Sequence, residues 1–134
     1  MRRLHHAGFA VKSIETTIER FAGSLGASWD SDIVEDPNQD VKVTFLRPFG
    51  LDSTPMIELV EPLSCQSPVH AYLRRGFGLY HLCYETESLV RDLDASRAAG
   101  ALIAKHPLRA AAFGGRLVAW VYTRERLLLE FLQK

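Results

Sequence analysis

The sequence predicts an α+β fold of two βαβββ repeats, whose curved sheets face each other around a cleft with the helices outside. The main observation is that the order of strand and helix patterns in residues 1–63 recurs in residues 77–134. Such internal repetition rarely arises by chance. Neither half has enough strands to bury its own sheet, so we expect a single domain over residues 1–134, with a linker helix at about 67–76.

The second observation is that chemically similar residues coincide when the halves are aligned. One constant shift superposes Leu4, His6, Ser13, Ile14 and Ile18 on Leu79, His81, Ser88, Leu89 and Leu93. A slightly shorter shift superposes Ile57, Glu58 and Leu59 on Leu129, Glu130 and Phe131. The repeats therefore share polar positions as well as apolar ones.

The first repeat opens with an apolar strand and an amphipathic helix. After Ser13, apolar residues recur every three or four positions until Gly26, which is the spacing of a helix with one buried face. The acidic, turn-rich residues 29–40 predict a strand edge and an exposed loop. A turn is expected at PFGLDSTP, residues 48–55. The strands of this repeat are expected at residues 4–11, 41–46 and 56–62.

The linker and the second repeat follow the same logic. Ser67 and Pro68 make a favourable helix start, with serine as cap and proline at the first helical position. In the second repeat we expect a helix from Ser88 to Gly100. Its strands are expected at residues 78–85, 101–104, 116–122 and 126–132.

The composition suits a globular domain that binds a small molecule. The 134 residues are 47% apolar, and 16 basic residues balance 16 acidic ones. This balance gives no electrostatic attraction for nucleic acid or an anionic membrane. No apolar stretch approaches the roughly 20 residues of a membrane span or resembles a signal peptide, so we expect a cytoplasmic protein. Cys65 and Cys83 form no CxxC motif and are expected to be reduced bystanders.

Two glutamates in apolar strands predict a metal site. Glu58 and Glu130 each lie between apolar neighbours. Burying an unpaired carboxylate costs several kcal/mol, so each needs a cation, a proton or water. No lysine or arginine occupies a matching strand interior, whereas His6 and His81 do, one in each repeat. We therefore expect a divalent ion held by His6, Glu58, His81 and Glu130, whose two carboxylates offset its charge.

The ligand types leave the metal's identity open. Two nitrogens and two oxygens suit zinc, nickel, cobalt, manganese or iron, and an octahedral ion would keep two positions for substrate oxygens. The alternative is that both histidines bond to backbone in the core while both glutamates lie at sheet edges. The matched occurrence of four such residues in two repeats favours the metal. His5 is the nearest competitor of His6, but strand alternation predicts that it points to the opposite face.

Several motifs, taken in order, resemble the vicinal oxygen chelate superfamily: LHHAGFAVKSIE, DPNQDVKVTFL, IELVEPL with SPVHAYL, GLYHLCYE and LLLEFLQ. That superfamily includes glyoxalase I, bleomycin-resistance proteins, extradiol dioxygenases and methylmalonyl-CoA epimerase, and the likeness to the epimerases is the closest. It covers essentially the whole chain and places the family's metal positions on His6, Glu58, His81 and Glu130. It also implies a homodimer.

The resemblance implies an isomerase or lyase that abstracts a proton alpha to a carbonyl through a metal-bound enolate, acting on an acyl-CoA as methylmalonyl-CoA epimerase does. One alternative is a glyoxalase I-like lyase acting on a glutathione adduct, and another is a non-catalytic binding or resistance protein. Glu130 or Glu58 could leave the metal and act as the base. Glu61 is a lesser candidate, and Val43 stands where some epimerases carry a glutamate.

Overall fold

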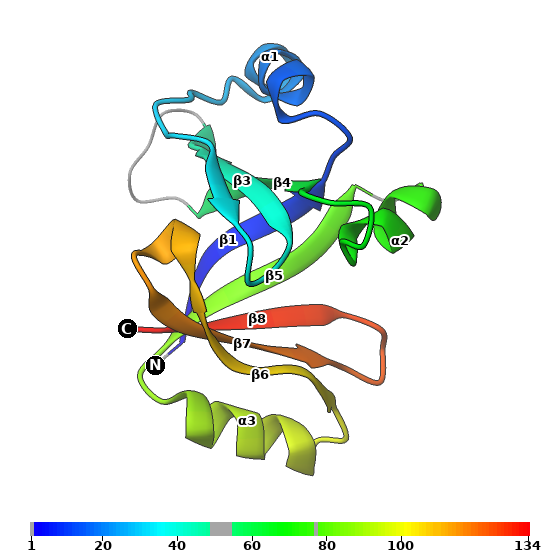
Figure 1. Cartoon of the computed structure of the whole chain (residues 1–134). Helices are drawn as coiled ribbons and strands as arrows, with labels where there is room; N and C mark the ends of the chain where they lie inside the picture. The colour runs from blue at the N-terminus through cyan, green and yellow to red at the C-terminus, as the bar shows by residue number, and fades with distance from the viewer. Residues whose placement is uncertain (1, 49–54, 77) are drawn as a thin grey trace.

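The computed structural model describes residues 2–48, 55–76 and 78–134. Most of the turn expected at PFGLDSTP, residues 49–54, lies outside these ranges. The described residues form eight strands, three α-helices and one short 3-10 helix (Figure 1). In chain order they are β1 (Arg3–Ala10), α1 (Ile14–Leu25), β2 (Val34–Asp36), β3 (Val41–Leu46), β4 (Met56–Pro62), α2 (Val69–Arg74), β5 (Leu79–Thr86), α3 (Leu89–Ala98), β6 (Leu102–Ala110), η2 (Ala111–Phe113), β7 (Arg116–Tyr122) and β8 (Leu128–Gln133).

The strands form one mixed sheet in the order β2-β3-β4-β1-β5-β8-β7-β6. Each half of the chain supplies four neighbouring strands, and the halves join where β1 and β5 pair antiparallel. Within each half the first strand pairs in parallel with the last, β1 with β4 and β5 with β8. The sheet curls so that the two halves face each other, with α1 and α3 at opposite outer ends (Figure 1). The α+β prediction is confirmed.

The two serines that align between the repeats, Ser13 and Ser88, are the N-caps of α1 and α3. The Ser13 hydroxyl accepts a hydrogen bond from the backbone N–H of Thr16, and the Ser88 hydroxyl accepts one from Arg91, both at 3.3 Å. Such caps satisfy N–H groups that have no partner within the helix. The Ser67 hydroxyl accepts from the backbone N–H of Val69, but α2 begins at Val69 with Pro68 as its N-cap, one residue later than predicted. Across the described ranges, no helix is both long and apolar enough to span a membrane.

Strand β6 is longer than predicted, because it continues to Ala110 instead of ending at residue 104. The apparent obstacle was Pro107, which has no N–H to donate to a neighbouring strand. The pairing of β6 with β7 shifts register between Lys105 and Leu108. This irregularity accommodates the proline and lets the strand resume.

Candidate metal centre

The two central strands bring His6 and His81 together. His6 lies on β1 and His81 on β5, and their Nε2 atoms are 3.0 Å apart. Both side chains are almost completely buried. The pairing of β1 with β5 thus brings the matched histidines of the two repeats into contact, with their ring planes nearly perpendicular.

Gly8 makes room for the His81 ring. In the ladder between β1 and β5, Gly8 lies directly opposite His81. A Cβ atom at Gly8 would lie only 2.1 Å from Cε1 of His81, far inside van der Waals contact. The Trp120 ring approaches the imidazole edge-on, with centroids 4.7 Å apart. His81 therefore occupies a slot that exists because residue 8 has no side chain.

The two glutamates approach from the strands that flank this central pair. Glu58 on β4 and Glu130 on β8 are both buried. Oε1 of Glu58 lies 3.6 Å from His6 Nε2 and 3.3 Å from His81 Nε2. Oε1 of Glu130 lies 3.3 Å and 3.6 Å from the same two atoms. All four predicted side chains therefore converge within one chain.

The cluster fits a divalent metal ion. Bonds of about 2.0–2.2 Å in a tetrahedral arrangement place donor atoms about 3.3–3.6 Å apart. The four nitrogen–oxygen distances span 3.3–3.6 Å, whereas the two histidine Nε2 atoms, 3.0 Å apart, would have to separate slightly around an ion. Within the described residues, His6, His81 and Glu130 each present a donor atom within 4.8 Å of the other two, and Glu58 completes the set only with a small shift. Within the described residues, Glu130 Oε1 is buried without a hydrogen-bond partner. A cation is what such an oxygen requires, because an unpaired buried carboxylate is costly.

Burial shifts the protonation of these groups away from a fully charged cluster. It raises the pKa of Glu58 to about 8 and lowers that of His81 to about 4. Burial would also raise the pKa of Glu130, but the imidazoles of His6 and His81 hold it below the usual value. In the absence of a metal, the Glu58 carboxyl therefore retains a proton at neutral pH while His81 is uncharged.

A narrow cavity leads to the cluster. It has about 20 Å³ of free space, enough for about one water molecule. Its walls include Val43, Lys105, Phe113 and Trp120 together with Glu58, His81 and Glu130 of the cluster. Phe113 stacks on His6, with ring centroids 5.8 Å apart and planes at 23°. Any molecule larger than water therefore requires the rim around Phe113 to move.

Of the charged residues near the site, Lys105 lines the cavity. Burial lowers the pKa of its half-buried ammonium. Arg109 instead donates to the carbonyl of Gly115, and Arg116 donates to Glu85 and to the carbonyl of Gln133. Glu61, the lesser candidate for a base, accepts from the backbone N–H of Ile14 and pairs with Lys42. It is not among the residues that line the cavity.

One wall of the cavity is a hydrogen-bonded group that sequence reasoning missed. Gln39 accepts from the indole N–H of Trp120 at 2.9 Å and donates to Asp36 at 3.0 Å. Asp36 also accepts from the backbone N–H of Ala111. Residues 29–40 were expected to form a strand edge and an exposed loop; β2 supplies the strand, yet Asp36 and Gln39 are buried. Their polarity suggested exposure, and only the partner Trp120, distant in sequence, explains their burial.

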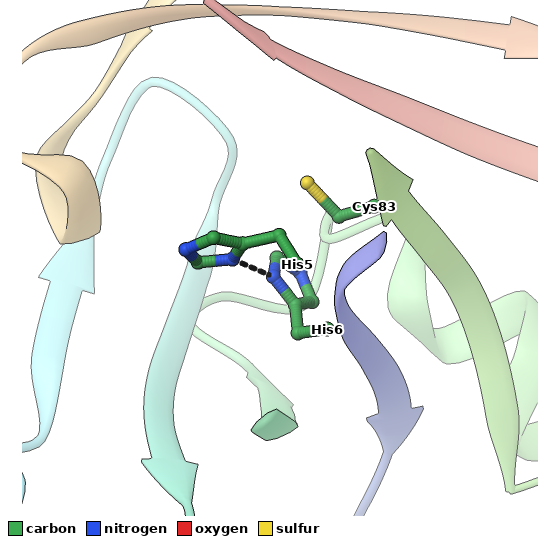
Figure 2. Close-up of side chains that lie close together, drawn as sticks. All are labelled: His5, His6 and Cys83. Carbon is green, nitrogen blue, oxygen red and sulfur yellow. Dashed lines mark hydrogen bonds between the residues drawn. The ribbon is translucent and has the colours of Figure 1, made fainter. Parts of the chain in front are cut away.

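The prediction that His5 points to the opposite face from His6 is wrong. Nδ1 of His5 lies 2.8 Å from Nδ1 of His6, as Figure 2 shows. The reason is a register shift between Leu4 and His6 in the pairing of β1 with β5, which interrupts the alternation of side chains. Cys83 also lies within reach, since its sulfur and one ring nitrogen of each histidine are within 4.8 Å of one another.

Burial shifts the pKa values of both additional residues. Burial, followed by the neighbouring His6, lowers the pKa of His5 to about 4. Burial raises the pKa of the Cys83 thiol. Cys65, in contrast, is exposed. Burial inside the sheet, followed by the neighbouring Glu130, therefore disfavours the Cys83 thiolate.

Comparison with known proteins gives a consistent family. Residues 5–120 match the model of the glyoxalase/bleomycin resistance protein/dioxygenase superfamily. The chain is 32% identical over 103 residues to an ethylmalonyl-CoA/methylmalonyl-CoA epimerase of Cereibacter sphaeroides, an alignment that covers 75% of this chain and 73% of the relative.

Solved structures agree on the fold. A hypothetical protein from Bacillus halodurans superposes with a TM-score of 0.83 at 29% identity, covering 99% of this chain and 94% of the other. A methylmalonyl-CoA epimerase variant of Streptomyces coelicolor in complex with 2-nitronate-propionyl-CoA superposes at 0.81, with 20% identity and coverage of 98% and 96%. The chain belongs to the glyoxalase/bleomycin resistance protein/dioxygenase superfamily.

Proposed function

We propose that this protein is a metal-dependent epimerase that moves the proton alpha to the carbonyl of an acyl-CoA thioester, as a methylmalonyl-CoA epimerase does. The observation that carries the proposal is the convergence of His6, Glu58, His81 and Glu130, with nitrogen–oxygen distances of 3.3–3.6 Å. These four residues would hold the divalent ion. The relative from Cereibacter sphaeroides supports the choice of substrate.

A divalent ion held there would act as a Lewis acid on the substrate carbonyl and acidify the adjacent C–H bond. The protein's own contribution is a base and a dry, fixed environment. Glu58 and Glu130 come from opposite halves of the sheet, on β4 and β8. One carboxylate oxygen can remove the alpha proton, and the other carboxyl can return a proton to the opposite face of the planar carbanion.

The surrounding side chains favour this division of roles. Val43 lines the cavity and has no acid or base to offer, and the third carboxylate of the lining, Asp36, is held by Gln39 and the backbone N–H of Ala111, so Glu58 and Glu130 are the carboxyl groups left for this role. Phe113 and Trp120 pack on His6 and His81, respectively, and exclude water from the imidazoles. The half-buried Lys105 gives the cavity a cationic wall that suits an anionic acyl group.

Isotope exchange tests this proposal. The protein reconstituted with zinc, nickel, cobalt, manganese or iron is incubated with methylmalonyl-CoA in deuterated water, and deuterium at the alpha carbon is followed by mass spectrometry. We expect exchange that depends on the metal and is lost in Glu130→Gln. Absence of exchange in fully metal-loaded protein would exclude this substrate. A parallel assay with the glutathione hemithioacetal of methylglyoxal tests the glyoxalase I-like alternative.

The complete set of four donors weighs against a purely sequestering protein of the resistance type. We also propose that the two repeats act as a single domain, since each supplies one histidine and one glutamate to the cluster. We propose a homodimer on the basis of the family. One chain already brings all four side chains together, so metal binding should persist when the protein is diluted to the monomer. Analytical ultracentrifugation monitors the dissociation.

A further inference from the structure

We infer that His5 is a positioning residue that fixes the tautomer and the ring orientation of His6 by accepting a hydrogen bond from His6 Nδ1. This inference rests on the proposed metal site. Its basis is the 2.8 Å separation of the two Nδ1 atoms, shown by the dashed line in Figure 2. Neighbouring residues of a strand do not normally touch in this way, and the bulge at Leu4 and His6 makes the contact possible.

The direction of the bond follows from which nitrogen faces the cluster. His6 Nε2 lies 3.0 Å from His81 Nε2 and 3.3 Å from Glu130, so it is the nitrogen that would bind a metal. A neutral imidazole whose Nε2 offers its lone pair carries its hydrogen on Nδ1. That hydrogen points to the lone pair of His5 Nδ1, and His5 then carries its own hydrogen on Nε2.

An imidazole in this role is unusual. Metal-bound histidines commonly donate their second N–H to a carboxylate, a backbone carbonyl or water. Among the described residues, His5 is the only hydrogen-bond partner of His6 Nδ1. Glu85, whose charge raises the pKa of His5, is already paired with Arg3 and Arg116.

The His5 ring is itself held in place by aromatic side chains. It meets Phe113 edge-on, with centroids 5.6 Å apart and planes at 85°. It meets Phe45 at 6.4 Å and 89°. These packed contacts restrict the rotation of His5, so that its lone pair stays directed at His6. The same two phenylalanines contact the His6 ring, and the pair therefore forms one packed unit.

The two halves of the site are unequal in this respect. Within the described residues, Nδ1 of His81 has no hydrogen-bond partner. The position of the second repeat that aligns with His5 is Tyr80, whose ring packs on His81 with centroids 5.1 Å apart. His81 is thus oriented by Gly8, Tyr80 and Trp120 through packing, whereas His6 is also oriented by a hydrogen bond.

A second metal site at His5, His6 and Cys83 is the competing explanation of this cluster. Two nitrogens that share a metal at about 2.0–2.1 Å stand about 3.3 Å apart in a tetrahedral arrangement. The observed 2.8 Å is a hydrogen-bond distance instead. The contact between the histidines therefore favours positioning.

Nitrogen-15 NMR of the full-length zinc-loaded protein tests the inference without a mutation. We expect His6 to carry its hydrogen on Nδ1 with Nε2 bound to zinc, and His5 Nδ1 to be unprotonated. A hydrogen on His5 Nδ1, or zinc bound through His6 Nδ1, would overturn the inference. Failure of the wild-type protein to bind any of zinc, nickel, cobalt, manganese or iron would overturn both the inference and the proposed function.

Two substitutions add an affinity measurement. His5→Phe keeps a ring but removes the acceptor, and His5→Asn keeps an acceptor near the Nδ1 position. Zinc affinity, from competition with a chelator, should fall tenfold to a hundredfold in His5→Phe and stay close to wild type in His5→Asn. His70→Phe, on α2 and outside the cavity lining, is the matched control; it loses the contact of the ring with the Ser64 carbonyl but should leave zinc affinity unchanged. Equal affinity in folded His5→Phe and wild type would refute the positioning role while leaving the metal site intact.

Discussion

Replacing Gly8 with alanine should damage the metal centre through a single methyl group. The added Cβ would lie 2.1, 2.5 and 2.7 Å from Cε1, Nδ1 and Nε2 of His81. Ordinary contact between such atoms is about 3.5–4.0 Å, so the overlap exceeds 1 Å. Trp120 and His6 flank the ring, with centroids 4.7 and 5.1 Å away, and leave it no room to retreat within the slot. The imidazole must therefore move away from the cluster or push the strands apart.

Overpacking of this kind costs about 1–3 kcal/mol of folding free energy. Zinc affinity should fall by tenfold to a hundredfold or more, since even the loss of a supporting contact to a metal ligand has that effect. Chemical denaturation of the chelator-treated protein measures the first quantity, and competition with a chelator measures the second. The expected signature of Gly8→Ala is a loss of both.

Gly23→Ala provides the matched control. A Cβ at Gly23, inside α1, would meet nothing within 4 Å. Alanine is a better helix former than glycine, so this variant should be more stable by about 0.5–1 kcal/mol and bind zinc as the wild type does. If Gly8→Ala bound zinc with wild-type affinity, His81 would not need this slot, and the reasoning about the site would be refuted.

Three further predictions concern the cluster. Burial raises the pKa of Glu58 to about 8 and lowers that of His81 to about 4, so zinc binding at pH 7 should release about one proton, from Glu58. Calorimetry in buffers of different ionisation enthalpy measures this number. Zero release would contradict the assignment. Because the folded protein holds the Glu58 proton more tightly than the unfolded chain does, the free energy of unfolding of the metal-free protein should fall as pH rises from about 4.5 through 8. Urea denaturation at a series of pH values measures this fall, and Glu58→Gln should abolish it. Zinc at about a thousandfold the wild-type Kd should stabilise the wild type by about 4 kcal/mol in the same assay. If Glu130→Gln were stabilised equally at that zinc concentration, Glu130 would not be a ligand.

The features that sequence predicted best follow from strong local rules. Ser13 and Ser88 were recognisable as caps because each is a favoured cap residue and is followed by apolar residues at helical spacing. The convergence of His6, Glu58, His81 and Glu130 was accessible because a buried carboxylate demands a partner and the repeats align. Local pattern and internal repetition together placed these four residues in one cluster.

The features that sequence missed depend on contacts between distant segments. The contact of His5 with His6 requires a bulge that arises where β1 meets β5, and nothing in the first strand alone signals it. The burial of Asp36 and Gln39 depends on Trp120, far along the chain. The length of β6 depends on a shift in its pairing with β7. In each case a partner strand or side chain overrides the local preference.

X-ray absorption of the zinc-loaded protein tests the central claim most directly, since it counts the atoms around the metal. The structure predicts one zinc per chain with only nitrogen and oxygen neighbours at about 2.0–2.2 Å, two of them imidazoles. The imidazole signal should halve in His81→Ala. A sulfur neighbour at about 2.3 Å, such as the Cys83 thiol would supply, or less than about half an equivalent of bound metal after reconstitution with each of the five candidate ions, would contradict the account.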